Sequence, residues 1–372
     1  MKVVIVNAFD TYEHRVELLY RYFKMHDCDV QVYVSDFQHI KKEYRNVKQK
    51  DYTFIHAEAY YKNLSVSRLQ SHKKFSERVY QRIKDQDIDL LWVLIPPNSL
   101  TSMAAQYKQY HTGTKVVLDM IDLWPETMPI HKFKNIPPLL WWKNMRDKNL
   151  EYADLIVTEC ALYQERINPF VRKPEMKTLY LAWPYHKKSL PVLNLDNVLR
   201  LCYLGSINNI IDIPTIGNMI NVIKERWDLK IEVHIIGDGE KREKYISELR
   251  KVGAKVIFYG KVYDEEKKKK IMDGCHLGIN IMKESVCVGL TMKSMDYLEN
   301  GLPILNNIKG DTWKLVEQKK IGINIDQLKN YTYNDVKKIV KNRAYIREVA
   351  EQLFSYEAFE KRMDQIISDM IS

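Results

Sequence analysis

Lys293 and Asp296 are the charged residues whose surroundings most clearly indicate chemistry. The segment 284–306 predicts a loop containing Gly289, a helix over 291–300 and a following strand. A helix that begins where a strand ends offers free N–H groups to an anion. Lys293 would add a full positive charge there, and Asp296, one turn further on, could accept hydrogen bonds from a ribose diol. An ordinary helix with an exposed Lys–Asp pair has the same spacing.

Asp119 and Asp122 form a second candidate group, at the end of a predicted strand over 116–120. Carboxylates at such a strand end could orient or deprotonate an acceptor hydroxyl, so both are candidate catalytic residues. Asp122 could instead cap the turn that follows it. The pair does not form a D-x-D motif, and none of the 10 histidines has an H-x3-H or HExxH spacing, so no metal site is predicted.

The elements that would position these residues follow a regular rhythm. Short β-branched runs alternate with amphipathic stretches of helical length, which predicts an α/β fold with parallel sheets. The runs fall into two series, so we expect two doubly wound Rossmann-like domains whose strand ends face a shared cleft. The expected strands are 3–6, 30–34, 90–95, 116–120 and 155–157 in the first series, and 199–205, 231–237, 255–260, 277–281 and 303–307 in the second.

The predicted boundaries follow from these two series. We expect a first domain over 1–185, a Pro-containing linker over 186–197 and a second domain over 198–345. The last segment, 346–372, predicts a C-terminal amphipathic helix that could pack back on the first domain.

Composition limits the class of partner. The 372 residues carry a formal net charge of +10, which favours anionic partners such as phosphorylated substrates or an anionic membrane surface. No zinc-finger spacing or RNP-like string is present, so a nucleic-acid partner is not expected. No apolar run approaches the ~20 residues of a membrane-spanning helix, and the 5 cysteines are widely spaced. We therefore expect a cytoplasmic protein, with peripheral contact at the inner face of the membrane as an additional expectation.

The segment 131–149 is the candidate for such a contact. It interleaves Trp141 and Trp142 with basic residues, a mixture that suits anionic lipid. A helix with internal tryptophans and solvated lysines would have the same composition. The basic residues are Lys132, Lys134, Lys143, Arg146 and Lys148, against Asp147 alone.

Several strings, in this order along the chain, resemble glycosyltransferases of the GT-B fold, particularly glycosyltransferase family 4. The string K-x-x-D-Y-L-x-x-G-x-P at 293–303 is similar to the nucleotide-sugar segment of that family, often P-x-K-x-x-E-Y-L-x-x-G-x-P, with Asp296 where the family has a ribose-binding glutamate. The other strings are VVLDMIDLWPE from 116, YLGSI from 203, HIIGDGEKREKY from 234 and FYGKV from 258.

The resemblance implies a retaining glycosyltransferase that uses a nucleoside diphosphate sugar as donor and needs no metal or other cofactor. The acceptor implied is a carbohydrate, which we expect to be lipid-linked, in surface or capsular polysaccharide biosynthesis. Asp119 and Asp122 remain the catalytic candidates. The candidate donor-binding residues are Gly205, Ser206, Lys261, Lys283, Glu284, Thr291, Met292, Lys293 and Asp296.

Three departures from the family pattern keep other functions open. Val288 stands where the family's E-x7-E pattern has its first acid, and Glu284 is the nearby acid that could take its place. The loop after Gly205 lacks the family's basic pair, and the first strand is not followed by a glycine-rich loop. A nucleotide-sugar 2-epimerase and a non-catalytic glycosyltransferase-like subunit that binds donor or partner are the alternatives.

Overall fold

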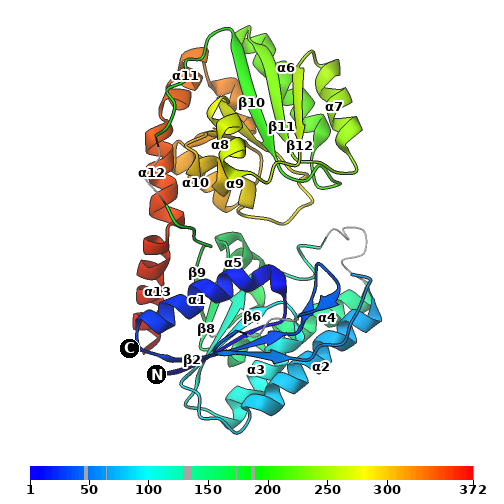
Figure 1. Cartoon of the computed structure of the whole chain (residues 1–372), viewed down its shortest axis with the longest axis vertical. Helices are drawn as coiled ribbons and strands as arrows, with labels where there is room; N and C mark the ends of the chain where they lie inside the picture. The colour runs from blue at the N-terminus through cyan, green and yellow to red at the C-terminus, as the bar shows by residue number, and fades with distance from the viewer. Residues whose placement is uncertain (46–48, 64, 129–135, 173, 186–188, 372) are drawn as a thin grey trace. The chain divides into compact units, whose positions relative to one another are not determined.

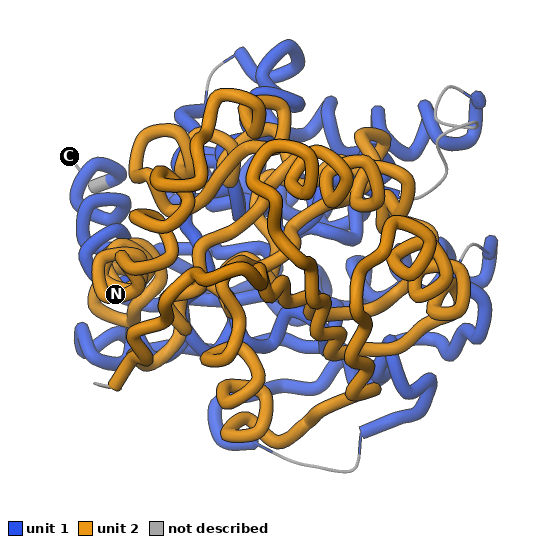
Figure 2. Tube along the Cα trace, turned by 90° about the horizontal axis from the view of Figure 1, so that it is seen from above, with its two compact units in different colours: residues 1–182, 359–372 blue, residues 183–358 orange. Residues whose placement is uncertain are grey.

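The computed structural model describes residues 1–45, 49–63, 65–128, 136–172, 174–185 and 189–371. The chain divides into two compact units: unit 1 comprises Met1–Ala182 with Phe359–Ser372, and unit 2 comprises Trp183–Ala358 (Figure 2). Each unit has its own parallel sheet with helices on both faces. The predicted α/β class with two Rossmann-like domains is therefore confirmed.

Unit 1 is built on a seven-stranded parallel sheet with the order β5-β2-β1-β6-β7-β8-β9. The chain passes from β1 to β2 through α1 and later returns to β6 through α2, so right-handed crossovers place these helices on opposite faces of the sheet (Figure 1). The strands are β1 (Lys2–Asn7), β2 (Asp29–Ser35), β5 (Tyr52–Ile55), β6 (Leu90–Ile95), β7 (Lys115–Met120), β8 (Leu155–Thr158) and β9 (Glu175–Thr178), with β3 (Phe37–Gln38) and β4 (Glu43–Tyr44) as a separate pair. The helices are α1 (Glu13–Met25), α2 (Val66–Ile83), α3 (Ser99–Tyr110), α4 (Pro137–Asp147) and α5 (Ala161–Ile167).

Unit 2 has a six-stranded parallel sheet with the order β12-β11-β10-β13-β14-β15. Helices α6 and α7 cover one face and α8, α9 and α10 the other (Figure 1). The strands are β10 (Val198–Leu204), β11 (Lys230–Ile236), β12 (Lys255–Gly260), β13 (Leu277–Asn280), β14 (Ile304–Asn306) and β15 (Gly322–Asn324). The helices are α6 (Ile213–Trp227), α7 (Arg242–Lys251), α8 (Glu265–Asp273), α9 (Met292–Glu299), α10 (Asp311–Lys319), α11 (Tyr333–Lys341) and α12 (Arg343–Phe354).

Continuous apolar runs form the central strands because both faces of each sheet are covered. All six residues of β6, LLWVLI, are fully buried, which is the pattern of an interior parallel strand. In β10 and β11 the alternate residues Leu199, Leu201, Ile231 and Val233 join the core beneath α6.

The C-terminal segment is two helices, not the single helix expected over 346–372. Helix α12 ends at Phe354 and α13 (Tyr356–Ile371) follows after Ser355. Ser355 has an extended backbone, and its hydroxyl oxygen accepts a hydrogen bond from the Ala358 N–H at 3.1 Å, so it caps the second helix. The Phe354 carbonyl accepts from the Trp183 N–H at 2.9 Å, which replaces the missing helical bond.

The part of α13 from Phe359 onward belongs to unit 1. The Tyr22 hydroxyl of α1 donates to Asp364 Oδ1 at 2.8 Å, and Lys177 of β9 pairs with Asp369 at 3.0 Å. The segment expected to be a linker belongs to unit 2, where Leu195 is 1% exposed and its carbonyl accepts from the Tyr333 hydroxyl at 2.6 Å.

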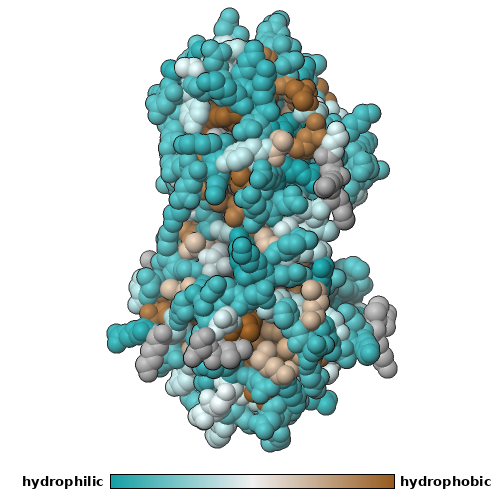
Figure 3. Space-filling model, turned by 90° about the vertical axis from the view of Figure 1, so that its left-hand side faces the viewer, coloured by the Kyte–Doolittle hydropathy of each residue, from teal (hydrophilic) through white to brown (hydrophobic). Residues whose placement is uncertain are grey.

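The face of the molecule in Figure 3 is mainly hydrophilic, with separate small apolar areas. Within the described ranges, no helix has both the length and the apolar character required to cross a bilayer.

Candidate functional site

A pocket of about 240 Å³ lies at the switch point of the unit 2 sheet. Strands β10 and β13 are neighbours there, while the connections that follow them go to opposite faces, and ligands bind at such points in doubly wound sheets. The pocket is lined by Tyr203, Leu204, Gly205, Ser206, Asn208, Ile210, Ile211, Met282, Thr291 and Lys293.

The loop after β10 forms one wall and is supported by the G-D-G turn that follows β11. The Gly205 N–H donates to the Ile236 carbonyl at 2.9 Å, and the Ile207 N–H donates to the Asp238 carbonyl at 3.0 Å. A Cβ atom at Gly237 would lie 1.9 Å from the Gly205 carbonyl oxygen, so only glycine permits this close approach. The G-D-G string therefore has a structural role in shaping the pocket.

The N-terminus of α9 forms the opposite wall. Thr291 caps this helix: its Oγ1 accepts from the Ser294 N–H at 3.2 Å, and Ser294 Oγ accepts from the Thr291 N–H at 3.2 Å. Within the described part of the chain, the N–H groups of Met292 and Lys293 have no hydrogen-bond acceptor. Free N–H donors at the positive end of a helix are favourable for an anion.

Lys293 adds an ammonium group to this site. The side chain is partly buried, and its Nζ lies 5.2 Å from the centroid of the Tyr203 ring, which forms the floor beneath it. Burial lowers the pKa of Lys293 to about 8, so the group is mainly protonated at neutral pH. A bound anion would favour the charged form further.

Asp296 lies one turn further along α9, where its side chain is 38% exposed. Lys268 of α8 is the nearest cation, with 4.0 Å between its Nζ and Asp296 Oδ1, and Lys268 also pairs with Glu265 at 2.6 Å. Partial burial raises the pKa of Asp296 to about 6, against the lowering effect of Lys268. The carboxylate is thus available as an acceptor at neutral pH and becomes protonated in mild acid.

The structure brings part of the predicted donor set together. Four of its members line the pocket: Gly205, Ser206, Thr291 and Lys293. Lys261 is exposed after β12, and Lys283 and Glu284 are exposed on the loop after β13. The backbone of Lys283 nevertheless supports the pocket wall, because its N–H donates at 2.9 Å to the carbonyl of Ile210, which lines the pocket. Met292 contributes its backbone N–H, while its side chain is 53% exposed.

Six of the ten lining residues lie outside the predicted donor set, among them Tyr203, Asn208 and Met282. Tyr203 is the penultimate residue of β10, Asn208 lies in the following loop, and Met282 follows β13. Their types carry no signal of their own, and only the pairing of β10 with β13 could have pointed to them.

Asp119 in unit 1 is not the accessible carboxylate that the sequence analysis expected. It lies inside β7 and is fully buried, where Oδ2 accepts from the Trp92 indole N–H at 2.9 Å and lies 3.4 Å from Arg15 Nε. Val116 to Met120 of β7 are all buried, because both faces of the sheet are covered, and Asp119 lies against Arg15 of α1. Asp119 thus contacts Arg15 and Trp92 in the interior, burial raises the pKa of its carboxyl group, and its catalytic role remains a prediction.

Asp122 lies just beyond β7 and is half-buried. Oδ1 accepts from the Leu123 N–H at 2.9 Å and Oδ2 from the Trp124 indole N–H at 2.7 Å, so the turn-capping interpretation fits its contacts. The Tyr12 hydroxyl also hydrogen-bonds to it, and burial raises the pKa of the carboxyl group.

Glu159 is a half-buried carboxylate that sequence reasoning missed. It follows β8 directly, and its N–H donates to the Met120 carbonyl at 3.1 Å, which places it beside the end of β7. Burial, with smaller effects of Asp122 and Asp119, raises the pKa of Glu159 to about 7, although the Arg15 charge acts in the opposite direction. The sequence feature that could have identified Glu159 as a candidate is its position directly after a predicted strand.

The basic aromatic segment is largely engaged within unit 1. Trp142 is buried, and Arg146 is fully buried in a pair with Glu126 at 2.9 Å, which Lys143 also approaches at 3.2 Å. Trp141 is 60% exposed. Lys132 and Lys134 lie outside the described residues. Two of the five basic residues, Lys143 and Arg146, are thus paired with Glu126, while Lys148 is exposed, and contact with an anionic membrane remains a prediction.

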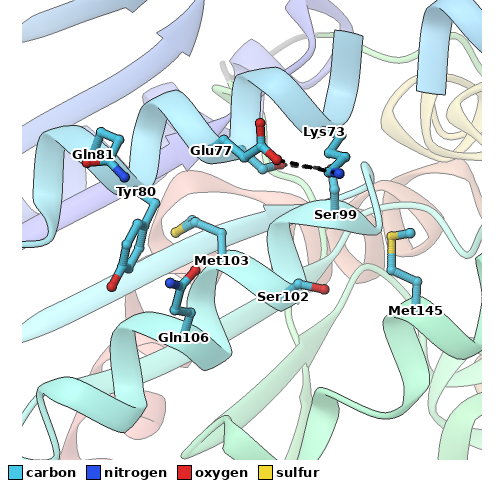
Figure 4. A pocket seen from close by; sticks show the side chains of 10 residues that line it. Lys73, Glu77, Tyr80, Gln81, Ser99, Ser102, Met103, Gln106 and Met145 are labelled. Atoms are coloured by element: carbon cyan, nitrogen blue, oxygen red, sulfur yellow. Dashed lines mark hydrogen bonds and ion pairs between the residues drawn. The ribbon is translucent and has the colours of Figure 1, made fainter. Parts of the chain in front are cut away.

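Two further pockets lie among α2, α3 and α4. One has a volume of about 360 Å³, and Figure 4 shows its lining, in which Lys73 and Glu77 form an ion pair at 3.7 Å. The other, of about 240 Å³, includes Trp141, Trp142 and Met145 and is mainly apolar. Lys73 and Glu77 are the charged residues that line the first pocket, and they pair with each other. The charged residues described above, at the ends of the strands, line neither of these two pockets.

No family model matches the chain, and no curated protein matches it in sequence. Solved structures do resemble it over its whole length. A sucrose-phosphate synthase from Thermosynechococcus elongatus has a TM-score of 0.65 and 12% identity, covering 100% of this chain and 99% of that chain. The lipopolysaccharide outer core galactosyltransferase WaaB has a TM-score of 0.68 and 14% identity, covering 99% and 100%. An E. coli structure described as trehalose-6-phosphate bound with UDP-2-fluoro glucose has a TM-score of 0.67 and 9% identity, covering 100% and 99%. The predicted GT-B fold is confirmed by this likeness.

Proposed function

We propose that this chain is a retaining glycosyltransferase that moves a sugar from a nucleoside diphosphate sugar to a carbohydrate acceptor. The observation that carries the proposal is the unit 2 pocket, where Lys293 and the N-terminus of α9 meet at the switch point of a doubly wound sheet. The UDP-2-fluoro glucose in a structure of the same fold supports a nucleotide sugar as donor.

In this proposal the donor diphosphate lies against the N–H groups of Met292 and Lys293 and the Lys293 ammonium. The diphosphate gains negative charge as the glycosidic bond breaks, and these fixed donors stabilise that charge without a resident metal. Asp296 accepts hydrogen bonds from the ribose hydroxyls. The departing diphosphate oxygen takes the proton of the incoming hydroxyl on the same face of the sugar, so the anomeric configuration is retained.

We assign the acceptor side to unit 1, with Asp122 and Glu159 as the groups that orient the incoming hydroxyl. Glu159 suits this role best, because a carboxyl group with a pKa of about 7 can hold or release a proton at neutral pH. A lipid-linked acceptor and a role in surface or capsular polysaccharide biosynthesis belong to the same proposal. The likeness to a lipopolysaccharide galactosyltransferase supports them.

Donor binding and transfer by the purified protein test the proposal. A thermal-shift panel of nucleotide sugars identifies the donor, because a ligand that binds only the folded state raises the melting temperature. Transfer or slow hydrolysis of that donor should then continue in excess EDTA. Lys293→Ala should reduce turnover, whereas Lys267→Ala and Lys270→Ala, at exposed positions of α8, should not. Equal effects of all three, or a strict need for Mg²⁺ or Mn²⁺, would contradict the proposal.

A non-catalytic donor-binding subunit is the second candidate, and Val288 favours it. This half-buried residue of the loop before α9 replaces the acid that the family pattern places there. Tight donor binding with neither transfer nor hydrolysis, also in Val288→Glu, would support the subunit.

A further inference from the structure

Three buried asparagines form a hydrogen-bonded ladder across the ends of the strands behind the unit 2 pocket. Asn280, Asn306 and Asn324 are the last residues of β13, β14 and β15, stand opposite one another in register and are fully buried. Asn280 Nδ2 donates to Asn306 Oδ1 at 2.9 Å, and Asn306 Nδ2 donates to Asn324 Oδ1 at 2.8 Å. The ladder ends at α10, where Asn324 Nδ2 donates to the Trp313 carbonyl at 3.2 Å.

The backbone of Ile308 fixes the direction of this ladder. Its N–H donates to Asn306 Oδ1 at 3.1 Å, and its carbonyl accepts from Asn306 Nδ2 at 3.1 Å. A backbone N–H can only donate and a carbonyl can only accept, so the Asn306 amide has a single favourable orientation. Asn280 must then turn its Nδ2 toward Asn306 Oδ1, which directs its own Oδ1 toward Thr291.

The ladder thereby determines to which acceptor the Thr291 hydroxyl donates its hydrogen bond. Thr291 Oγ1 lies 2.9 Å from Asn280 Oδ1 and 3.0 Å from Ser294 Oγ. Ser294 Oγ already accepts from the Thr291 N–H, whereas Asn280 Oδ1 has no other donor among the described contacts. A hydroxyl that donates to Asn280 keeps its lone pairs for the Ser294 N–H, and this is the bond that caps α9.

We propose that the Asn280–Asn306–Asn324 ladder is a positioning device that acts through Thr291 to fix the N-terminus of α9 for the donor diphosphate. Asn306 is the central positioning residue, because it alone joins the ladder to the backbone reference at Ile308. This inference rests on the proposed donor site. It adds that residues without any contact to the donor set its affinity, and that Thr291 serves as a cap and not as a diphosphate ligand.

The test compares a variant of the ladder and a variant of Thr291 with a matched cap elsewhere in unit 2. Thr332 caps α11 through the same kind of capping box as Thr291, so Thr332→Val controls for the loss of a cap as such. Thr291→Val and Asn306→Leu remove the link to α9, while Thr291→Ser retains the hydroxyl and should restore wild-type behaviour. Thr291→Val covers the case in which Asn306→Leu does not fold.

Two measurements are made on the full chain. Calorimetry gives the dissociation constants of UDP, GDP and ADP, whichever binds, and of the matching monophosphate. Thr291→Val and Asn306→Leu should weaken the diphosphate at least tenfold and the monophosphate less than threefold. Hydrogen exchange followed by mass spectrometry should show faster exchange in the 289–298 peptide of these two variants, and wild-type exchange there in Thr291→Ser and Thr332→Val.

Each outcome decides a separate point. Wild-type diphosphate affinity in folded Thr291→Val and Asn306→Leu overturns the inference, and so does a parallel loss of both nucleotides. If the wild-type chain binds none of the diphosphates, the proposed function fails and the donor role of the ladder fails with it. The exchange data still show in that case whether the ladder holds α9, and unchanged exchange in the two variants overturns that part as well.

Discussion

Donor affinity should pass through a maximum near pH 7, because the two charged groups of the proposed donor site titrate on either side of this pH. Asp296 must be ionised to accept from the ribose, and its pKa is about 6. Lys293 must be protonated to hold the diphosphate, and its pKa is about 8. Both values describe the free protein, so affinity falls with the ionised fraction of Asp296 in acid and with the protonated fraction of Lys293 in alkali.

The size of the effect follows from these fractions. Each group is about nine-tenths in its required form at pH 7 and about one-tenth at one unit beyond its pKa. Affinity should therefore be about tenfold lower at pH 5 and at pH 9 than at pH 7, or about 1.4 kcal/mol in binding free energy. The ligand should be the intact nucleotide sugar, whose diphosphate is esterified at both ends and keeps its charge over this range.

Isothermal titration calorimetry of wild type and three variants separates the loss of affinity in acid (the acid limb) from the loss in alkali (the alkaline limb). Asp296→Asn should remove the acid limb and leave the alkaline one, while Lys293→Met should remove the alkaline limb. Lys268→Met should move the acid limb to higher pH, because Lys268 favours the ionised form of Asp296. A flat profile between pH 5 and 9, or an acid limb that persists in Asp296→Asn, would refute the reasoning.

Three further predictions concern stability and surface. Lys293→Met should raise the melting temperature while weakening donor binding, because burial penalises the Lys293 charge by at most about 3 kcal/mol. This penalty is full below pH 8, declines as the pH rises above 8 and is lost only above the ordinary lysine pKa of 10.5, so a lower melting temperature at pH 7 would contradict the prediction. Asp119→Asn should lower the free energy of unfolding by about 3 kcal/mol in urea titrations, since it leaves Arg15 charged and buried without its partner; wild-type stability would show that Asp119 is dispensable. If the chain binds vesicles, Trp141→Ser should reduce co-sedimentation, because the Trp141 side chain is exposed. Lys143→Ser should not, because Lys143 is paired with Glu126. Release by high salt together with an effect of Lys143→Ser would instead indicate that basic residues bind anionic lipid.

Features encoded by a short stretch of sequence could be predicted. The β6 run is apolar throughout because an interior parallel strand is covered on both faces, and the predicted and observed limits, 90–95, coincide. The helix start at Thr291 could be predicted because capping depends on neighbouring residues. Strands β5, β9 and β15 were missed, since each is short and lies at an edge of its sheet, where it depends on pairing with its one neighbouring strand.

Features that depend on distant contacts could not be predicted from local patterns. Lys268 and Lys269 belong to a lysine run that resembles a solvated helix face, yet their side chains are 15% and 19% exposed and pair with Asp296 and Asp273. The burial of Asp119 depends on Arg15, more than 100 residues away along the chain, and the bend at Ser355 depends on the bond from Trp183 to the end of α12.

The departures from the family pattern acquire a physical meaning in unit 2. Where the family places basic residues after the first glycine of the second domain, this chain has Ser206 and Asn208, and Lys293 is the one cation among the described residues of the pocket lining. In the proposed donor site a single ammonium offsets most of the diphosphate charge, so its placement has to be accurate. The Tyr203 ring beneath Lys293 and the asparagine ladder behind Thr291 restrict that placement from two sides. The loss of one basic pair would thus be offset by the rigidity of the N-terminus of α9.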